Sequence, residues 1–332
     1  MRQGEAVAVE APREPPLVLV GESPAARRLA DAIRSAAAAR CVLLEGEGGL
    51  DAVEIARAIH IQSTRRPRFV AVDCAAADPG LVERDVFGDQ CRRTAGDLEV
   101  ITPASALARA NGGTLYLGEI AELSAAAQAR LARVARDGEV RLSGGVVPLD
   151  VCVIASTSTD PESDLEEGRL RRDLLRRFSR ARIALPALRR RAEDIPAMVN
   201  ALIARLCTEA GAARKTLTQP AMTLLAAMPW KGNLVELRRA ISRLVSDVAA
   251  DVIELEDVLA HVRFDGALAP QAPAGTLRAA RLQFERDYIA LVLQHHRGRV
   301  GDAARALGIQ RTNLYRKARQ LGISVARPVQ QP

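Results

Sequence analysis

The hydrophobic and polar positions along the chain divide it into two parts with different periodicities. In the first part, short apolar runs recur at 41–44, 69–72, 114–117, 151–155 and 181–185. Helical spacing fills the segments around them, with a helix capped by Ser23 that extends to about residue 39 and further helices at 53–60, 81–87, 104–109, 125–136 and 169–178. Strands that alternate with helices predict an α/β core, in which a parallel sheet is covered on both faces.

After Pro186 the apolar runs of strand length stop and only helical spacing remains. Helices are predicted at 195–210, 219–228, 233–248 and 255–261, and then near 276–296, 301–307 and 310–321. A segment rich in Ala, Pro and Gly at 265–275 separates these two sets of helices. We therefore predict a lead at 1–16 that is disordered, an α/β subdomain at 17–186, a helical subdomain at 187–263, a linker at 264–275 and a small all-α domain at 276–325.

Composition excludes several classes of protein. The chain has 332 residues, 48% of them hydrophobic, which is enough for buried cores, yet no run of about 18 apolar residues that would span a membrane. Residues 1–16 hold charges and prolines but no apolar stretch of the kind found in signal peptides. The five cysteines are scattered without a C-x-x-C pair, so we expect a reducing compartment and a cytoplasmic protein without membrane contact.

The excess positive charge is confined to the end of the chain. Residues 267–332 contain eleven Lys or Arg and three Asp or Glu, a net charge of +8, which leaves −1 for the rest because the whole chain carries +7. A basic module beside a near-neutral body indicates nucleic-acid binding, although a solvated basic tail would have the same charge.

The segment 301–317 has the pattern of a helix-turn-helix. Ala303 and Ala304 permit a close helix crossing, Gly308 suits a left-handed residue at the end of the first helix, and Ile309 and Leu314 are placed to point inward. The second helix then offers side chains that read bases or hold phosphate in double-stranded DNA, namely Arg311, Thr312, Asn313, Tyr315, Arg316 and Lys317. The alternative is a surface helical hairpin that carries basic side chains.

These motifs resemble those of a known family. Residues 284–323 look like the Fis-type domain of bacterial transcription activators, in which a preceding long helix forms a dimer. Residues 17–262 resemble the AAA+ domain of sigma-54-dependent enhancer-binding proteins, the NtrC family, through "VLLEGEGG", "EIARAIH", "LVERDVFG", "ANGGTLYLGEI", "RLRRDLLRRF", "LPALRRRAEDIP" and "MPWKGNLVELRRAI". The resemblance implies a three-layer AAA+ core with a helical lid, a self-assembled ring and an ATP site.

The nucleotide loop of that family departs from its pattern here. The loop contains Gly46, Glu47, Gly48, Gly49, Asp51, Ala52 and Val53, and the family's Gly-Lys pair is replaced by Asp51 and Ala52. The chain has three lysines and the first is Lys215, so no shift of alignment supplies the cation that neutralises phosphates. Asp51 adds a negative charge near the expected phosphate position, which disfavours triphosphate binding.

Other positions named by the resemblance are also changed. Gly118 replaces the aspartate that orients magnesium, Val235 replaces an arginine, and the hydroxyls of 156–158 stand where an Asn often ends the first sensor. Residues 89–97 lack the GAFTGA loop that contacts sigma-54. Glu119, which orients water in the family, is retained, as is the arginine-finger pair Arg171 and Arg177. The surrounding stretch is rich in arginine, so chance or a role in subunit contacts explains the presence of these two arginines equally well.

We therefore expect a DNA-binding transcription regulator that is not an enzyme, with its AAA+ domain used for oligomerisation or partner docking. ATP would bind weakly or not at all, and no metal site is predicted. The chain itself, RNA polymerase or an active AAA+ relative are the expected protein partners. Two alternatives remain, an ATP-dependent sigma-54 activator and a Fis-like nucleoid architectural protein. Only about sixteen residues precede the AAA+ module, so we expect control by expression, a partner or a ligand rather than by a receiver domain.

Overall fold

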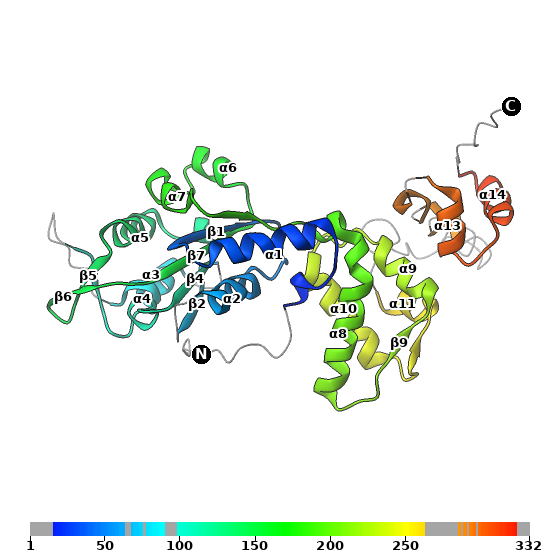
Figure 1. Ribbon diagram of the computed structural model, residues 1–332, viewed down its shortest axis with the longest axis horizontal. Coiled ribbons are helices and arrows are strands. Elements are labelled where there is room, and N and C mark those ends of the chain that lie inside the picture. Colours follow the sequence, from blue (N-terminus) through cyan, green and yellow to red (C-terminus); the bar gives the residue numbers. More distant parts are fainter. Residues whose placement is uncertain are drawn as a thin grey trace. The chain divides into compact units, whose positions relative to one another are not determined.

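The computed structural model describes residues 16–63, 68–75, 78–89, 98–262, 285–286, 288–290, 292–296 and 298–323. The chain forms two compact units, residues 1–187 and 188–332, which are described separately (Figure 1). The predicted lead up to residue 15, the linker at 264–275 and most of the loop at 89–97 lie outside the described residues.

A five-stranded parallel sheet forms the centre of the first unit. Its spatial order is β2–β4–β7–β1–β8, and every predicted apolar run forms one of its strands: β1 (Cys41–Glu45), β2 (Phe69–Asp73), β4 (Thr114–Gly118), β7 (Cys152–Thr157) and β8 (Arg182–Ala184). The central strands β4 and β7 are buried along their whole length, which explains their continuous apolar sequence.

Helices cover both faces of this sheet. α1 (Pro24–Ala36) and α2 (Ala52–Gln62) pack together against one face (Figure 1). On the other face, a continuous apolar core joins Leu43, Leu117 and Ala155 to α3 (Pro79–Phe87), α4 (Ala106–Arg109), α5 (Ala125–Asp137) and α7 (Arg172–Phe178). The α/β class and three-layer arrangement predicted from the sequence are confirmed.

Several elements of this unit were not predicted. A second, three-stranded sheet contains β3 (Val100–Ile101), β5 (Glu139–Leu142) and β6 (Gly145–Pro148). A short helix α6 (Pro161–Glu166) precedes α7, and residues 169–171, which were expected to be helical, lie before α7 because that helix starts only at Arg172. Short 3-10 helices lie at Leu17–Leu19 (η1) and Ile120–Glu122 (η2).

In its described residues the second unit is helical, as expected, apart from two paired strands of two residues each, β9 (Thr216–Leu217) and β10 (Val252–Ile253). Its helices are η3 (Leu188–Asp194), α8 (Ile195–Ala210), α9 (Gln219–Ala227), α10 (Asn233–Asp247) and α11 (Leu255–His261), followed near the C-terminus by α13 (Val300–Ala306) and α14 (Arg311–Gln320). Buried Asn233 accepts a hydrogen bond from the Leu188 amide (2.9 Å), which joins α10 to the start of the unit.

Two further findings concern membrane spans and thiols. None of the helices in the described part is long and apolar enough to cross a lipid bilayer. Cys41, Cys74, Cys152 and Cys207 form no disulfide, and the fifth cysteine, Cys91, lies outside the described residues.

Candidate functional site

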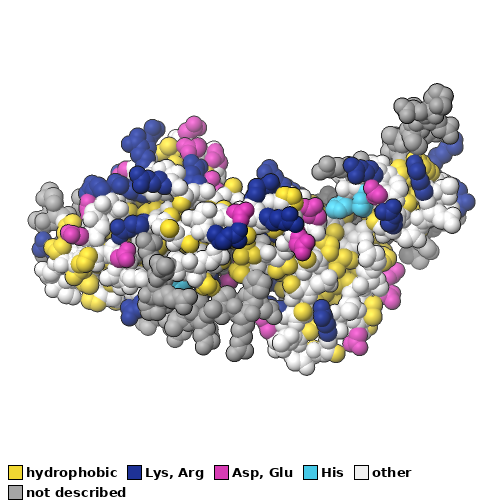
Figure 2. Space-filling model, in the orientation of Figure 1, with side chains coloured by type: hydrophobic (Ala, Val, Ile, Leu, Met, Phe, Trp, Pro, Cys, Tyr) yellow, Lys and Arg dark blue, Asp and Glu magenta, His cyan; other side chains and the backbone are white. Residues whose placement is uncertain are grey.

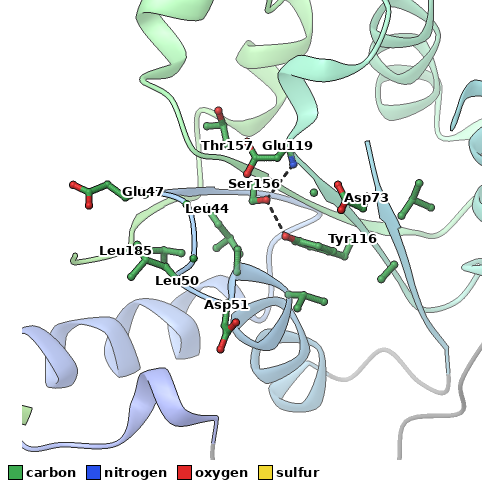
Figure 3. Close-up of a pocket in the computed structure, with 18 residues that line it drawn as sticks. Leu44, Glu47, Leu50, Asp51, Asp73, Tyr116, Glu119, Ser156, Thr157 and Leu185 are labelled. Atoms are coloured by element: carbon green, nitrogen blue, oxygen red, sulfur yellow. Dashed lines mark hydrogen bonds between the residues drawn. The ribbon is translucent and has the colours of Figure 1, made fainter. Parts of the chain in front are cut away.

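A cavity of about 380 Å³ opens at the carboxyl edge of the five-stranded sheet (Figure 3). One wall is formed by residues 46–53, which are the loop between β1 and α2 and the first two residues of α2, and the other by the ends of β2, β4 and β7. Because parallel strands end at the same edge, residues far apart in the sequence meet here, which is the usual position of ligand sites in α/β folds.

The loop is shaped by three glycines, of which Gly46 is tightly packed and Gly48 lies beside open space. A side chain at Gly46 would meet Leu185 Cβ at 2.8 Å and Leu50 Cδ1 at 2.9 Å, so this position packs firmly against the segment that follows β8. A side chain at Gly48 would meet nothing within 4 Å. Gly49 has a φ of 82°, which favours glycine. The loop is therefore anchored at one end and leaves open space beside Gly48.

Asp51 precedes α2 in a left-handed conformation, with φ 53° and ψ 47°, and its side chain makes no capping hydrogen bond. In Figure 3 the carboxylates of Asp51 and Glu47 both point away from Tyr116 and Ser156. Both residues nevertheless belong to the lining of the cavity, and Ala52 supplies no cation beside them. The N-terminus of an eleven-residue helix still faces this loop.

The opposite wall is a dense set of hydrogen bonds around Glu119. Tyr116 Oη and Ser156 Oγ lie 2.8 Å apart, and Ser156 Oγ accepts from the Glu119 amide at 3.4 Å. Ser158 donates to Glu119 Oε2 twice, from its amide (2.9 Å) and its hydroxyl (2.8 Å). Glu119 is held at φ 52°, a conformation that costs a non-glycine residue about 1 kcal/mol or more. Beside it, a side chain at Gly118 would make only ordinary contacts, from 3.5 Å outward.

Burial and nearby negative charge raise the pKa values of two side chains on this side of the cavity, Tyr116 and Cys74. Burial raises the pKa of Tyr116 to about 12, against the opposing effect of its hydrogen bond with Ser156. Burial also raises the pKa of the Cys74 thiol to about 12, and the charges of Asp73, Glu119 and Glu122 act in the same direction. Both side chains are therefore protonated and uncharged at neutral pH.

No lysine, arginine or histidine is among the described residues that line the cavity. Arg57 on α2 is the nearest candidate by sequence for a replacement cation. It pairs instead with Glu54 (3.5 Å), and its guanidinium lies 4.7 Å from the centre of the Phe69 ring. We also find no group of three or more His, Cys, Asp or Glu that could hold a metal within the described parts of the chain.

The predicted arginine-finger pair lies outside the lining of this cavity, at the start of α7 and within it. Arg171 is the residue directly before that helix and forms two hydrogen bonds with Asp173, at 3.0 and 2.9 Å, which lower the pKa of the Asp173 carboxyl. Arg177 is exposed on the same helix. Figure 2 shows basic side chains gathered over α7 beside acidic side chains over α6.

The predicted recognition helix is α14, and its geometry fits the sequence pattern. Leu314 and Ala318 are buried, and Gly308 has a φ of 66° between the two helices. Arg311, Thr312 and Arg316 are exposed, whereas Asn313 and Tyr315 are half-buried. The Arg311 guanidinium lies 5.8 Å from the centre of the Tyr315 ring. Lys317 differs from the expectation, since it forms an ion pair with Glu285 of the preceding segment.

The helix expected to form a dimer is only partly described. Tyr288, Ile289 and Val292 are buried within the chain, so these three are not available as an exposed apolar face. Leu282, Phe284 and Leu291, further apolar residues of the same segment, lie outside the described side chains.

Three family models match consecutive parts of the chain. Residues 19–184 match the sigma-54 interaction domain, 189–273 the AAA+ ATPase lid domain and 280–321 the Fis family of bacterial regulatory proteins. The transcriptional regulator NtrC of Proteus hauseri is 31% identical over 92% of this chain and 70% of its own length. The phenol regulator MopR of Acinetobacter guillouiae is 33% identical over 89% of the chain, which spans 54% of that relative.

Solved structures agree with these matches. NtrX from Brucella abortus in complex with ADP superposes with a TM-score of 0.72 at 32% identity, over 92% of this chain and 70% of that one. The same protein in complex with ATP gives a TM-score of 0.71.

These findings correct one expectation, that the chain is not an enzyme. Its second unit matches a lid domain of AAA+ ATPases, and its fold is that of a protein solved with both ADP and ATP. The expectation was wrong because it considered side chains alone. A nucleotide loop also binds through backbone amides and a helix N-terminus, and neither depends on the residue at position 52.

The matched domains, their order along the chain and the similar relatives lead to one conclusion. The chain belongs to the NtrC-like family of sigma-54-dependent transcriptional regulators.

Proposed function

We propose that this protein is an ATP-dependent, DNA-bound activator of sigma-54 RNA polymerase. The observation that carries the proposal is the cavity at the sheet edge, which combines a glycine-rich loop that leaves open space beside Gly48 with a glutamate held by hydrogen bonds. Family matches from residue 19 to 321 support the remaining parts of the proposal, since a lid domain and a DNA-binding domain follow the sigma-54 interaction domain along the chain.

The residues of the loop fit a nucleotide by shape. The Gly46 amide already donates to the Thr157 carbonyl (3.2 Å), so the backbone of the loop beyond Gly46 and the N-terminus of α2 would hold the phosphates, and the open space beside Gly48 leaves room for them. The nucleotide supplies a phosphoanhydride bond whose hydrolysis releases the energy for remodelling a partner. Glu119, held by Ser158 and Ser156, would orient the attacking water through its carboxylate.

The substitutions in the loop set the expected strength of binding. A lysine beside the phosphates contributes a close charge–charge attraction worth several kcal/mol in a partly buried site, and Ala52 makes none. We therefore propose that ATP binds weakly, and that turnover requires high nucleotide concentration or a ligand, such as DNA, that favours self-assembly.

We propose that the recognition helix α14 binds a palindromic site in double-stranded DNA, with Arg311, Thr312 and Arg316 as the exposed contacts. Two copies would be needed for the two halves of such a site. Assembly of further copies through the AAA+ units would place RNA polymerase and the bound DNA in one complex.

The experiment is equilibrium ATP binding and ATP hydrolysis by the purified full-length chain, with Mg²⁺, with and without its DNA site. Glu119→Gln is the matched control, since it keeps the shape of the cavity and removes the carboxylate. Expected results are weak binding, slow turnover that rises with protein concentration and DNA, and loss of turnover in Glu119→Gln.

Absence of ATP binding at millimolar nucleotide and micromolar protein would overturn the proposal. Turnover that is equal in Glu119→Gln would assign it to a contaminating enzyme. Transcription from a sigma-54 promoter in a purified system then tests the activator role directly.

A further inference from the structure

Four consecutive hydroxyl residues end strand β7 and continue beyond it, Ser156, Thr157, Ser158 and Thr159. Successive side chains of an extended segment point to opposite sides. The structure follows this rule. Ser156 and Ser158 form hydrogen bonds with Glu119, whereas Thr157 and Thr159 form hydrogen bonds with a different carboxylate. We call residues 156–159 the hydroxyl strip.

The second carboxylate is Asp164, which is completely buried. Thr157 Oγ1 donates to Asp164 Oδ2 at 3.4 Å, and Thr159 Oγ1 donates to the same oxygen. Thr157 and Thr159 also lie within hydrogen-bond distance of each other, at 3.0 Å. A buried carboxylate is stable only when it is paired and hydrogen-bonded, so this arrangement is specifically built.

The partner that neutralises Asp164 is Arg169. Its guanidinium Nε donates to Asp164 Oδ1 at 2.9 Å, and the Leu170 amide donates to the Asp164 carbonyl at 3.0 Å. On the other side of this segment, buried Gln128 donates to the Arg169 carbonyl (2.7 Å) and accepts from the Arg171 amide (2.8 Å). Residues 169–171, directly before the arginine-rich helix α7, are thus clamped between two buried side chains.

From these contacts we propose that the hydroxyl strip is a two-sided relay between Glu119 and the arginine segment at 169–171, with Asp164 as its positioning residue. Glu119 lies at one end in a strained left-handed conformation that its serine partners maintain. A change at Glu119 pulls on Ser158, shifts the adjacent threonines and alters the hold of Asp164 on Arg169. The orientation of α7 then depends on the state of the cavity.

The functional meaning of this relay rests on the proposed function, since a nucleotide in the cavity is what would change Glu119. The relay itself does not rest on the proposed function, because its contacts exist in the ligand-free chain. The test is therefore made first without nucleotide and then with it.

Amide hydrogen exchange of the full-length chain measures both ends. Ser158→Ala removes one hydroxyl at the Glu119 end, on an exposed residue where the fold is tolerant. We expect exchange at the Leu170 and Arg171 amides to rise at least threefold, although neither touches residue 158. The matched control is Ser163→Ala, which removes an exposed hydroxyl bonded to Asp160 and leaves the strip intact.

Asp164→Asn would test the centre of the relay directly, but it changes a buried ion pair and the variant need not fold. Thr157→Val therefore tests the middle of the strip with little change of shape. It should raise exchange at Leu170 and Arg171, and also at the Glu119 amide. Exchange that changes only at residues 119–123 in Ser158→Ala, or only at 169–171 in Thr157→Val, would overturn the relay.

Saturating ATP is then added. It should slow exchange at Leu170 and Arg171 in the natural chain and have less than half that effect in Ser158→Ala. If ATP does not bind, the proposed function fails while the nucleotide-free result still decides the relay. If ATP binds and slows exchange equally in both proteins, the relay does not carry the signal and the proposed function stands.

Discussion

The two walls of the sheet-edge cavity differ in how they are held. The loop wall, residues 46–53, is shaped by its glycines and by packing at one end, and it carries Asp51 in a strained conformation before α2. The strand wall joins Tyr116, Ser156, Ser158 and Glu119 in one connected network of side chains. The loop wall has lost the lysine of the family's nucleotide-binding pattern, whereas the strand wall keeps the candidate catalytic carboxylate Glu119, although Gly118 and the hydroxyls of 156–158 depart from that pattern too.

This difference separates two contributions to ATP hydrolysis, the affinity for the nucleotide and the positioning of the attacking water. Affinity for a phosphate chain depends on charge in the loop, whereas the position of an attacking water depends on the geometry of the strand ends. A chain can lose part of the first and keep the second. The following variants test that separation, in order of expected effect.

Glu119→Gln should lower ATP turnover about 100-fold, because it removes the group that orients and activates water while keeping the size of the side chain. The Kd for ATP should change less than threefold, since the carboxylate belongs to the strand wall. Steady-state turnover and equilibrium binding measure the two effects. Glu122→Gln, an exposed carboxylate in the next turn, is the control, and equal loss in both variants would contradict the prediction.

Asp51→Gly with Ala52→Lys should tighten ATP binding at least tenfold. The pair adds a cation, removes an anion and relieves the left-handed strain at residue 51, and a single charge contact in a partly buried site exceeds the roughly 1.4 kcal/mol that a tenfold change needs. Titration with ATP measures it. Glu54→Lys changes the net charge by the same amount one turn away, and an equal gain there would mean a general electrostatic effect.

Arg316→Ala should weaken binding to the DNA site about tenfold and reduce the slope of log affinity against log salt by about one. Lys317→Ala should have a smaller effect, because that ammonium pairs with Glu285. Binding at several salt concentrations distinguishes them. Arg305→Ala on α13, whose guanidinium pairs with Asp302 at 3.7 Å, serves as the basic control. A larger loss for Lys317 than for Arg316 would mean that the ion pair opens on DNA.

Tyr116→Phe should lower the free energy of unfolding by about 1 kcal/mol, the usual contribution of one hydrogen bond. The pKa of Tyr116 is raised to about 12 in the folded chain, so its contribution is complete below about pH 10, the ordinary pKa of tyrosine, and lost as pH rises toward 12. Denaturant unfolding at about pH 8 and pH 11 measures this. The variant should lose less stability between these pH values than the natural chain, and a parallel loss would assign the effect to other groups.

The sequence predicted the central sheet because buried parallel strands leave an unbroken apolar signal. β4 is buried at all five positions, and all five strands of its sheet were expected within two residues of their ends. The three-stranded sheet was missed because its strands are short and half-exposed. A signal for its hairpin was present, since Ser143 and Gly144 lie between a segment with alternating apolar residues, Val140 and Leu142, and the apolar pair Val146 and Val147.

The site was predicted unevenly for a similar reason. Motif spacing located the loop and Glu119, but no local pattern marks Asp164, whose role comes from contacts with segments on both sides. The same contacts explain why α7 begins at Arg172 and not at Arg169 as helical spacing predicted. The direction of the Asp51 carboxylate, away from Tyr116 and Ser156, also depends on packing that the sequence order does not record.

The packing of Gly46 against Leu185 has a consequence for synthesis of the protein. β1 pairs with β7 and β8, strands that lie more than a hundred residues later in the chain, and Leu185 closes one side of the cavity. A nascent chain emerging from the ribosome therefore holds its nucleotide loop without both partner strands until residue 185 has been made. Until then the cavity lacks one of its sides, so the growing chain cannot bind a ligand there.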